Sequence, residues 1–221
     1  MGEQSNKRHN KSTYSSPTLA EETTLYAQGY QSIAGIDEVG RGALAGPVVA
    51  AAVILPPLVN PARLKGVRDS KEITAAKREI LYRLIMDESV AVGIGIIPPQ
   101  IIDSVNILNA TRLAMQQAIE QLNYSPDFLL IDGITIPRMH ILQKKIIKGD
   151  KLCFSIACAS IIAKVTRDRI MVELHESYPH YGLAKHKGYG TAYHLSCIGQ
   201  HGPSPIHRLS FAPLREIYKL L

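Results

Sequence analysis

Short apolar runs alternate with stretches of helical apolar spacing along most of this chain. Runs typical of strands cover residues 33–37, 48–55, 90–97 and 128–131, and a weaker β-like run covers 145–148. Apolar residues three or four positions apart predict one helix that begins after Thr74, a second over 104–122 and a third over 155–175. Because strands and helices alternate, the pattern predicts an α/β domain with a mixed sheet.

Two of these helices show their expected core faces in the sequence. The hydroxyl of Thr74 can cap the first helix. Apolar positions recur there on two adjoining faces, Ala76, Ile80 and Leu84 on one and Leu81 and Ile85 on the other. The helix over 104–122 gathers apolar residues on one face, namely Ile107, Ala114, Met115, Ala118 and Leu122.

The first 31 residues differ from the rest of the chain. They are rich in Ser, Thr and Gln, and only a short helix after Pro17 is indicated. We expect residues 1–31 to form a flexible polar extension and residues 32–221 to form one folded domain that ends in a helical segment.

Composition and charge narrow the possible functions. The 221 residues are 46% hydrophobic and 20% charged, which indicates a soluble globular protein and excludes disordered, collagen-like and coiled-coil classes. The net charge of +6 is unevenly distributed: residues 138–221 hold 13 Lys and Arg against 5 Asp and Glu. This favours a polyanionic partner such as nucleic acid, although composition alone fits a basic protein without one equally well.

The cysteines and the chain's apolar stretches indicate the compartment. Cys153, Cys158 and Cys197 lack the spacing of a zinc or redox motif, so we expect reduced core residues. The N-terminus has no apolar signal segment, and the charge-free stretch 43–59 contains glycine and proline that argue against a membrane span. A cytoplasmic protein with no membrane association is predicted.

A glycine-rich turn follows the first strand, at Gly40-Arg41-Gly42. The spacing argues against a dinucleotide-binding motif at this turn, because three residues separate Gly42 from Gly46, one more than that motif allows. A strand pattern follows where the motif needs a helix N-terminus to hold the phosphates. Asp37-Glu38 lies just before the turn and would repel phosphate unless a cation lay between them.

Carboxylates close several of the predicted strands. Asp37 ends the first, Asp132 ends a central one, and Asp150 follows the run at 145–148. The carboxyl ends of neighbouring parallel strands converge where α/β sheets bind ligands. A single strand-end Asp is often only a turn former, but three such ends beside this turn favour a Mg²⁺ or Mn²⁺ site.

Asp37 and Glu38 raise a geometric question. Adjacent residues on a strand point to opposite faces, so both reach one metal site only if the strand bends; otherwise one contributes its backbone carbonyl. Two metal ions held by carboxylates suit phosphoryl transfer, and the basic later segment could hold the polyanionic substrate.

Several blocks of residues make the chain resemble the ribonuclease HII family. They lie in colinear order over residues 32–214, and are 33–42, 45–49, Asp69-Ser70-Lys71, Ile131-Asp132-Gly133, Lys148-Gly149-Asp150, 155–168, 187–191 and 207–211. The resemblance implies a ribonuclease H-like fold: a mixed five-stranded sheet flanked by helices, with a helical C-terminal part. Residues 32–221 are then the catalytic domain.

The same resemblance implies a function. It implies an endonuclease that cleaves the RNA strand of RNA–DNA hybrids and incises duplex DNA at single ribonucleotides, leaving 5′-phosphate and 3′-hydroxyl ends. It implies four catalytic, metal-binding residues, Asp37, Glu38, Asp132 and Asp150, and Mn²⁺ or Mg²⁺ as cofactor. A monomer is expected.

The resemblance also implies substrate contacts. The ribose would be read by Gly40, Arg41, Gly42 and Tyr189, and a phosphate would be contacted by Ser70 and Lys71. Such reading is chemically sensible because the 2′-hydroxyl distinguishes RNA from DNA, because glycines allow close backbone approach and because a tyrosine can stack on a sugar. Without the resemblance, Tyr189 would be only an exposed loop aromatic, and Ser70 and Lys71 only a helix-flanking pair.

Other polar residues are expected to be structural. His186, His194, His201 and His207 show no metal-ligand spacing, and Asp168 is expected to be an ion-pair partner. Two alternatives remain open: another metal-dependent nuclease or integrase of the same fold, and a non-catalytic nucleic-acid-binding module. The first lacks the pairing of the Gly-Arg-Gly turn with the Lys-Gly-Tyr loop, and the second needs no cluster of acids.

Overall fold

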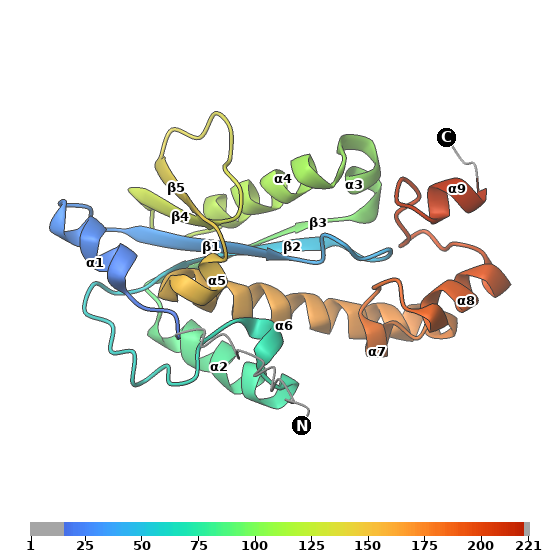
Figure 1. The fold of residues 1–221 in the computed structure, drawn as a ribbon, viewed down its shortest axis with the longest axis horizontal. Coiled ribbons are helices and arrows are strands. Elements are labelled where there is room, and N and C mark those ends of the chain that lie inside the picture. Colours follow the sequence, from blue (N-terminus) through green and yellow to red (C-terminus); the bar gives the residue numbers. More distant parts are fainter. Residues whose placement is uncertain (1–15, 219–221) are drawn as a thin grey trace, which may run out of the picture.

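The computed structural model describes residues 16–218 of the chain (Figure 1). The strands in this region are β1 (Ile33–Val39), β2 (Val48–Ile54), β3 (Ala91–Ile97), β4 (Phe128–Asp132) and β5 (Leu142–Ile146). Its helices are α1 (Ala20–Ala27), α2 (Ala75–Glu88), α3 (Pro99–Val105), α4 (Ile107–Glu120), α5 (Gly149–Leu152), α6 (Phe154–Ser177), α7 (Leu183–His186), α8 (Ala192–His201) and α9 (Leu214–Tyr218). Two 3₁₀ turns are η1 (Ser70–Glu72) and η2 (Pro179–Tyr181).

The strands form one mixed sheet, as the sequence predicts. Their order is β3-β2-β1-β4-β5. The first three strands in the chain pair antiparallel, whereas β4 runs parallel to both β1 and β5. The carboxyl ends of β1, β4 and β5 therefore lie at one edge of the sheet.

Helices cover both faces of this sheet (Figure 1). α4 packs across β2 and β3 on one face, and the long helix α6, backed by α2, packs across β1 and β2 on the other. β2 is buried along its whole length, so its alternating side chains enter both cores. Val49, Ala51 and Val53 face the α6 side, and Val48, Ala50 and Ala52 face the α4 side.

The core face of α2 is narrower than its apolar spacing predicts. Leu81 and Ile85 are buried, but Ile80 is 61% exposed and Leu84 is 36% exposed. α2 lies outside α6 as a second layer, so only one stripe of it meets the core (Figure 1). The predicted cap is confirmed, because the Thr74 hydroxyl accepts a hydrogen bond from the Lys77 amide.

The helix predicted over 104–122 is present as α4, with Ala114, Met115 and Ala118 buried, but its predicted start is wrong. Residues 104 and 105 belong to α3, and the two helices meet at Asn106, whose φ of 68° cannot continue a helix. The Asn106 side chain accepts a hydrogen bond from the Asn109 amide at 3.1 Å and so caps α4. The apolar spacing continues across this break, which is why the pattern alone did not show it.

Part of the predicted polar extension is packed against the domain. α1 places Leu25 against Ile33 and Leu130 of the sheet. Its buried Glu22 carboxylate accepts a hydrogen bond from the Ser155 amide at 2.8 Å, at the positive N-terminal end of α6. The residues expected to form the rest of the extension, 1–15, lie outside the described part of the chain.

The same segment also supports the joint between α5 and α6. The Thr18 amide donates to the Leu152 carbonyl at 3.1 Å, and the Phe154 amide donates to the Thr18 carbonyl at 3.0 Å. Because α5 carries Asp150, these bonds help to fix the position of that carboxylate.

The C-terminal helices gather at one end of the sheet (Figure 1). Apolar residues from α6, α7, α8 and α9 form a separate cluster there with Leu44 and Ala45 of the turn before β2. All three cysteines are unpaired and buried, as expected of reduced core residues. Over the described residues, no helix has the length and apolar character needed to cross a bilayer.

Candidate active site

A cavity of about 370 Å³ opens where the carboxyl ends of the parallel strands meet. The four predicted acids line it together with Ser70, Lys71 and Tyr189. Three further residues complete the lining, Val39, Ser160 and Lys164. The remaining predicted residues, Gly40, Arg41 and Gly42, form the adjoining turn.

The register of the sheet explains why the carboxylates converge. Ile36 on β1 pairs with Ile131 on β4, so Asp37 and Asp132 are the next residues on two parallel neighbours. The third parallel strand, β5, leads directly into α5, where Asp150 lies in the first turn. Three segments that are distant in sequence thus bring their acids to one edge of the sheet.

Asp37 and Glu38 both line the cavity although β1 does not bend between them. The ladder with β2 continues regularly, with Asp37 opposite Ala51 and Glu38 opposite Ala50. On the other side, the ladder with β4 ends at the pair Ile36–Ile131. The end of β1 therefore extends past its pairing with β4. Side chains from both faces of β1 can reach a cavity beside that unpaired edge.

Each carboxylate on β1 and β4 is held by a specific hydrogen bond. Asp37 accepts from the Glu38 amide at 2.7 Å and from the Ser160 side chain. Asp132 accepts from the Gly149 amide at 2.6 Å. Glu38 Oε1 lies 3.1 Å from the Arg41 guanidinium, whereas Glu38 Oε2 is buried without a hydrogen-bond partner.

Burial and mutual repulsion disfavour the charged forms of these acids. Burial raises the pKa of Asp37 well above its ordinary value, and repulsion from Glu38 and Asp132 adds to this shift. Burial also raises the pKa values of Glu38 and Asp132, although Arg41 opposes the shift at Glu38. The pKa of Asp150 is raised by burial and then by repulsion from Asp69 and Asp132.

The donor set fits a hard divalent cation. In the described part of the chain, no three His, Cys, Asp or Glu side chains already stand close enough together to hold a metal ion. The acids that share this cavity nevertheless offer only oxygen, and Glu38 Oε2 is a buried oxygen without a hydrogen-bond partner, which suits it to bind a cation. A cation among them would stabilise the charged forms that burial and repulsion disfavour.

The loop that carries Ser70 and Lys71 is attached to the acidic site. Ser70 Oγ lies 3.0 Å from Ser160 Oγ, and Ser160 in turn bonds to Asp37. Asp69 caps η1 by accepting from the Lys71 amide at 2.9 Å. The exposed Lys71 side chain is thereby placed at the rim of the cavity.

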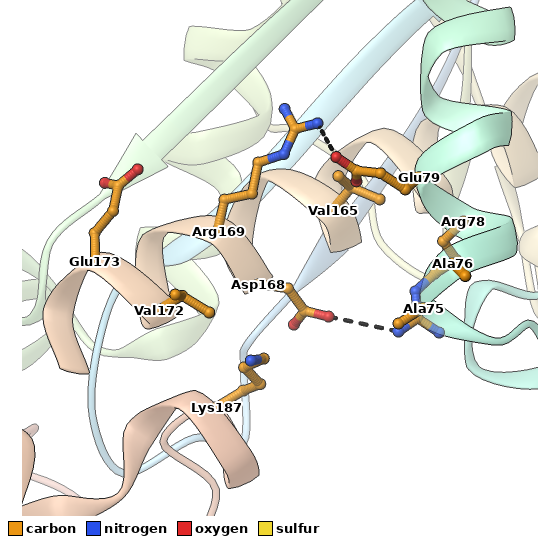
Figure 2. Close-up of a pocket in the computed structure, with 10 residues that line it drawn as sticks. All are labelled: Ala75, Ala76, Arg78, Glu79, Val165, Asp168, Arg169, Val172, Glu173 and Lys187. Carbon is orange, nitrogen blue, oxygen red and sulfur yellow. Dashed lines mark hydrogen bonds and ion pairs between the residues drawn. The ribbon is translucent and has the colours of Figure 1, made fainter. Parts of the chain in front are cut away.

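A more open groove of about 530 Å³ lies behind this loop, between α2 and α6 (Figure 2). Asp168 faces Arg78 across it and also bonds to Lys164 at 2.6 Å. Arg78 donates to the Ser70 carbonyl at 2.9 Å. Asp168 is thus an ion-pair partner, as the sequence predicts, but its partners are Lys164 and Arg78 and not its neighbours in sequence.

The residues just after the Gly-Arg-Gly turn are bonded to the Tyr189 loop. The Gly188 carbonyl accepts hydrogen bonds from the amides of Leu44 at 2.8 Å and Ala45 at 3.3 Å. Gly188 has a φ of +81°, and a Cβ there would lie 2.4 Å from the Ala45 carbonyl oxygen. Glycine is therefore required where the two segments meet.

Two buried arginines strengthen this junction. Arg208 donates to the carbonyls of Arg41 and Gly46, both at 3.0 Å. Arg167 donates to the Lys187 carbonyl at 2.9 Å, and its guanidinium lies 5.6 Å from the centre of the Tyr189 ring. Both arginines are fully buried.

The sequence interpretation assigned no role to these arginines, nor to Ser160 and Lys164. One signal was available for Arg167, because it lies four residues from both Ala163 and Met171, which share a buried face of α6. A charged residue at such a position needs polar partners nearby.

Comparison with known proteins decides the family. A model of the family described as Ribonuclease HII matches residues 34–214. This chain belongs to the ribonuclease HII family. A ribonuclease HII of Dehalococcoides mccartyi is 56% identical over 205 residues, which are 93% of this chain and 97% of that relative.

Solved structures agree with the observed fold. The ribonuclease H2 of Pyrococcus horikoshii OT3 has a TM-score of 0.71 and 28% identity, and the match covers 85% of this chain and 97% of that one. A Bst-RNase HIII in complex with Mn²⁺ has a TM-score of 0.69 at 20% identity, over 88% of this chain and 71% of that one, and supports the fold alone. As a ribonuclease HII, this protein is a hydrolase, an endonuclease of the ribonuclease H type that acts on RNA–DNA hybrids and depends on divalent metal.

Proposed function

We propose that this ribonuclease HII cleaves the RNA strand of RNA–DNA hybrids and also incises duplex DNA at single embedded ribonucleotides. The reaction is an in-line hydrolysis that leaves 5′-phosphate and 3′-hydroxyl ends. One observation carries the proposal: a single cavity joins the four acids to Tyr189, and the loop of Tyr189 is bonded to Leu44 and Ala45, just after the Gly-Arg-Gly turn. Groups suited to phosphoryl transfer and groups suited to ribose reading thus share one site.

The four acids are the proposed metal ligands. Asp37, Glu38, Asp132 and Asp150 would hold Mn²⁺ or Mg²⁺, both of which take oxygen ligands. When bound, such ions activate water and stabilise the leaving oxygen of an in-line displacement. The complex of Bst-RNase HIII with Mn²⁺ shows that a protein of this fold accommodates that ion.

The chain's cationic and polar groups would position the scissile strand. Lys71 and Lys164 line the same cavity as the acids and can neutralise phosphate oxygens, while Ser70 offers a hydroxyl. Such contacts fix the register of the strand but do not distinguish RNA from DNA.

Ribose reading is assigned to the joined loops. Gly42 has no heavy atom within 4 Å of where its Cβ would lie, so a sugar can approach the backbone of the turn. Tyr189 is 37% exposed and can stack on the neighbouring sugar. The 2′-hydroxyl is the group that such contacts would select.

The two alternatives from the sequence fit the site less well. A non-catalytic nucleic-acid binder would be weakened by buried acids that repel phosphate. Another metal-dependent nuclease of this fold would have no use for a Gly-Arg-Gly turn that leads directly into residues bonded to a tyrosine loop beside the acids.

The chemistry of the product ends tests the mechanism. We expect the protein to convert an RNA–DNA hybrid to 5′-phosphate and 3′-hydroxyl fragments with Mn²⁺ or Mg²⁺, and to stop when EDTA removes the metal. The ends are read by kinase labelling before and after phosphatase treatment. Fragments with 2′,3′-cyclic phosphate ends would contradict the proposal, because they arise when the ribose 2′-oxygen attacks in place of water.

A further inference from the structure

Three histidine rings lie next to one another beside the Tyr189 loop, and none of them lines the acidic cavity. The centres of the His186 and His194 rings are 4.4 Å apart at an interplanar angle of 24°. His194 Nε2 lies 3.1 Å from His207 Nε2. His194 and His207 are buried, and their elements, α8 and the segment before α9, are separate in the chain.

The partners of these rings define a directed chain of hydrogen bonds. The Ser204 amide donates to His207 Nδ1 at 3.0 Å, so that nitrogen is an acceptor and His207 Nε2 carries the proton. His207 Nε2 then donates to His194 Nε2. His194 Nδ1 must therefore carry a proton, and it donates to the Tyr189 carbonyl oxygen at 3.0 Å.

His186 supports the same loop by a parallel route. Its Nδ1 accepts from the Gly188 amide at 3.2 Å, and its Nε2 therefore donates to the Tyr181 carbonyl at 2.7 Å. Every ring nitrogen of the three histidines thus has a partner and a defined role.

We propose that His194 is a positioning residue for Tyr189, and that His207 fixes the tautomer of His194 in which Nδ1 donates to the Tyr189 carbonyl. This inference rests on the proposed function, in which Tyr189 contacts the ribose. A histidine serves here because its two ring nitrogens can accept from one partner and donate to another at the same time. A tyrosine on an otherwise exposed loop is thereby held at a fixed distance from the Gly-Arg-Gly turn.

The relay stays neutral under ordinary conditions. Burial lowers the pKa of His194 and of His207 to about 4, and the facing His186 adds to both shifts. The other titratable groups that face these histidines include Tyr181, Tyr193, Lys187 and His175. The histidines are therefore a fixed support at neutral pH and not a switch.

Two amide substitutions separate the two ends of His194. In His194→Asn the side-chain amide nitrogen takes the place of Nδ1 and keeps the bond to the Tyr189 carbonyl. In His194→Gln the amide oxygen takes the place of Nε2 and accepts from His207, and the donor to the Tyr189 carbonyl is lost. On duplex DNA with one ribonucleotide, we expect His194→Gln to lower kcat about tenfold with little change in KM, because Lys71 and Lys164 still hold the phosphates. His194→Asn should stay within about threefold of the wild type, as should the control His201→Gln on the exposed end of α8.

A second readout is independent of activity. Nitrogen-15 NMR of the wild type should show a proton on Nδ1 of His194 and on Nε2 of His207. The ring signals of Tyr189 should shift in His194→Gln and stay near their wild-type positions in His194→Asn.

The outcomes distinguish the two proposals. Equal losses of kcat in the Asn and Gln variants, or an Nε2-protonated His194, would overturn the positioning role. If the wild type cut no ribonucleotide-containing duplex, the proposed function would fail, and the NMR signals alone would then decide whether His194 positions Tyr189.

Discussion

The substitution Asp37→Asn is expected to remove metal-dependent cleavage and, at the same time, to raise the melting temperature of the metal-free protein. Asp37 is the most buried of the four acids, and its charged form is disfavoured by burial and by Glu38 and Asp132. Asparagine keeps the shape and can still accept from the Glu38 amide, but it brings no charge. Cleavage should fall on the order of a thousandfold or more, since a proposed metal ligand is lost.

The stability gain should depend on pH in a definite direction. The folded-state pKa of Asp37 is raised above the ordinary value of 3.8, so folding favours the protonated form. The wild type therefore loses stability as pH rises from about 4, and the variant escapes that loss. For a domain of this size, each kcal/mol gained raises the melting temperature by about 2–4 °C.

Thermal unfolding at pH 5 and pH 8, with and without Mn²⁺, checks both parts of this prediction. The gain over the wild type should be larger at pH 8 and should shrink when Mn²⁺ stabilises the wild type. Asp87→Asn, on the exposed face of α2, is the matched control and should change neither property. Undiminished cleavage by Asp37→Asn would refute the metal-site assignment, and a lower melting temperature would refute the electrostatic account.

The second large effect concerns substrate choice. Tyr189→Ala should lower kcat/KM on duplex DNA with one ribonucleotide about 10- to 100-fold, because a single sugar offers one place to be read. On a long RNA–DNA hybrid the loss of kcat/KM should be smaller, about threefold. Such a hybrid has many ribonucleotides, and their additional contacts with the protein can compensate for the lost tyrosine. Steady-state cleavage of both substrates by the same preparation measures the two losses together.

The control for this variant is Tyr193→Ala. Tyr193 is 57% exposed on α8, four residues along the chain, and does not line the acidic cavity. We expect it to cleave both substrates at the wild-type rate. Equal losses on the two substrates in Tyr189→Ala would contradict the ribose-reading role.

Much of the fold could be predicted because its signals are local. Strand runs, the Thr74 cap and strand-end acids are properties of neighbouring residues, and the alternation of strands with helices predicts the mixed sheet. The core face of α2 depends on what packs above it, and the break at Asn106 depends on one positive φ inside a continuous apolar pattern. The spacing of apolar residues predicts neither the narrow core face of α2 nor the helix break.

The site divides in the same way. Motif blocks pointed to the acids, the Gly-Arg-Gly turn and Tyr189, because each block is short and chemically distinctive. The roles of Arg167, Arg208 and His194 could not be predicted in this way. Each side chain donates to a backbone carbonyl of a distant segment. Polar groups that support a site through main-chain atoms leave little trace in a single sequence.

The most direct test of the central claim uses the wild-type protein and two duplexes that differ only in one 2′-hydroxyl. One strand carries a single ribonucleotide, and the control is all DNA; both are incubated with Mn²⁺ or Mg²⁺ and resolved beside size markers. The account predicts one nick at the ribonucleotide and none in the all-DNA duplex. Equal cutting of both duplexes, or cutting of neither, would contradict it.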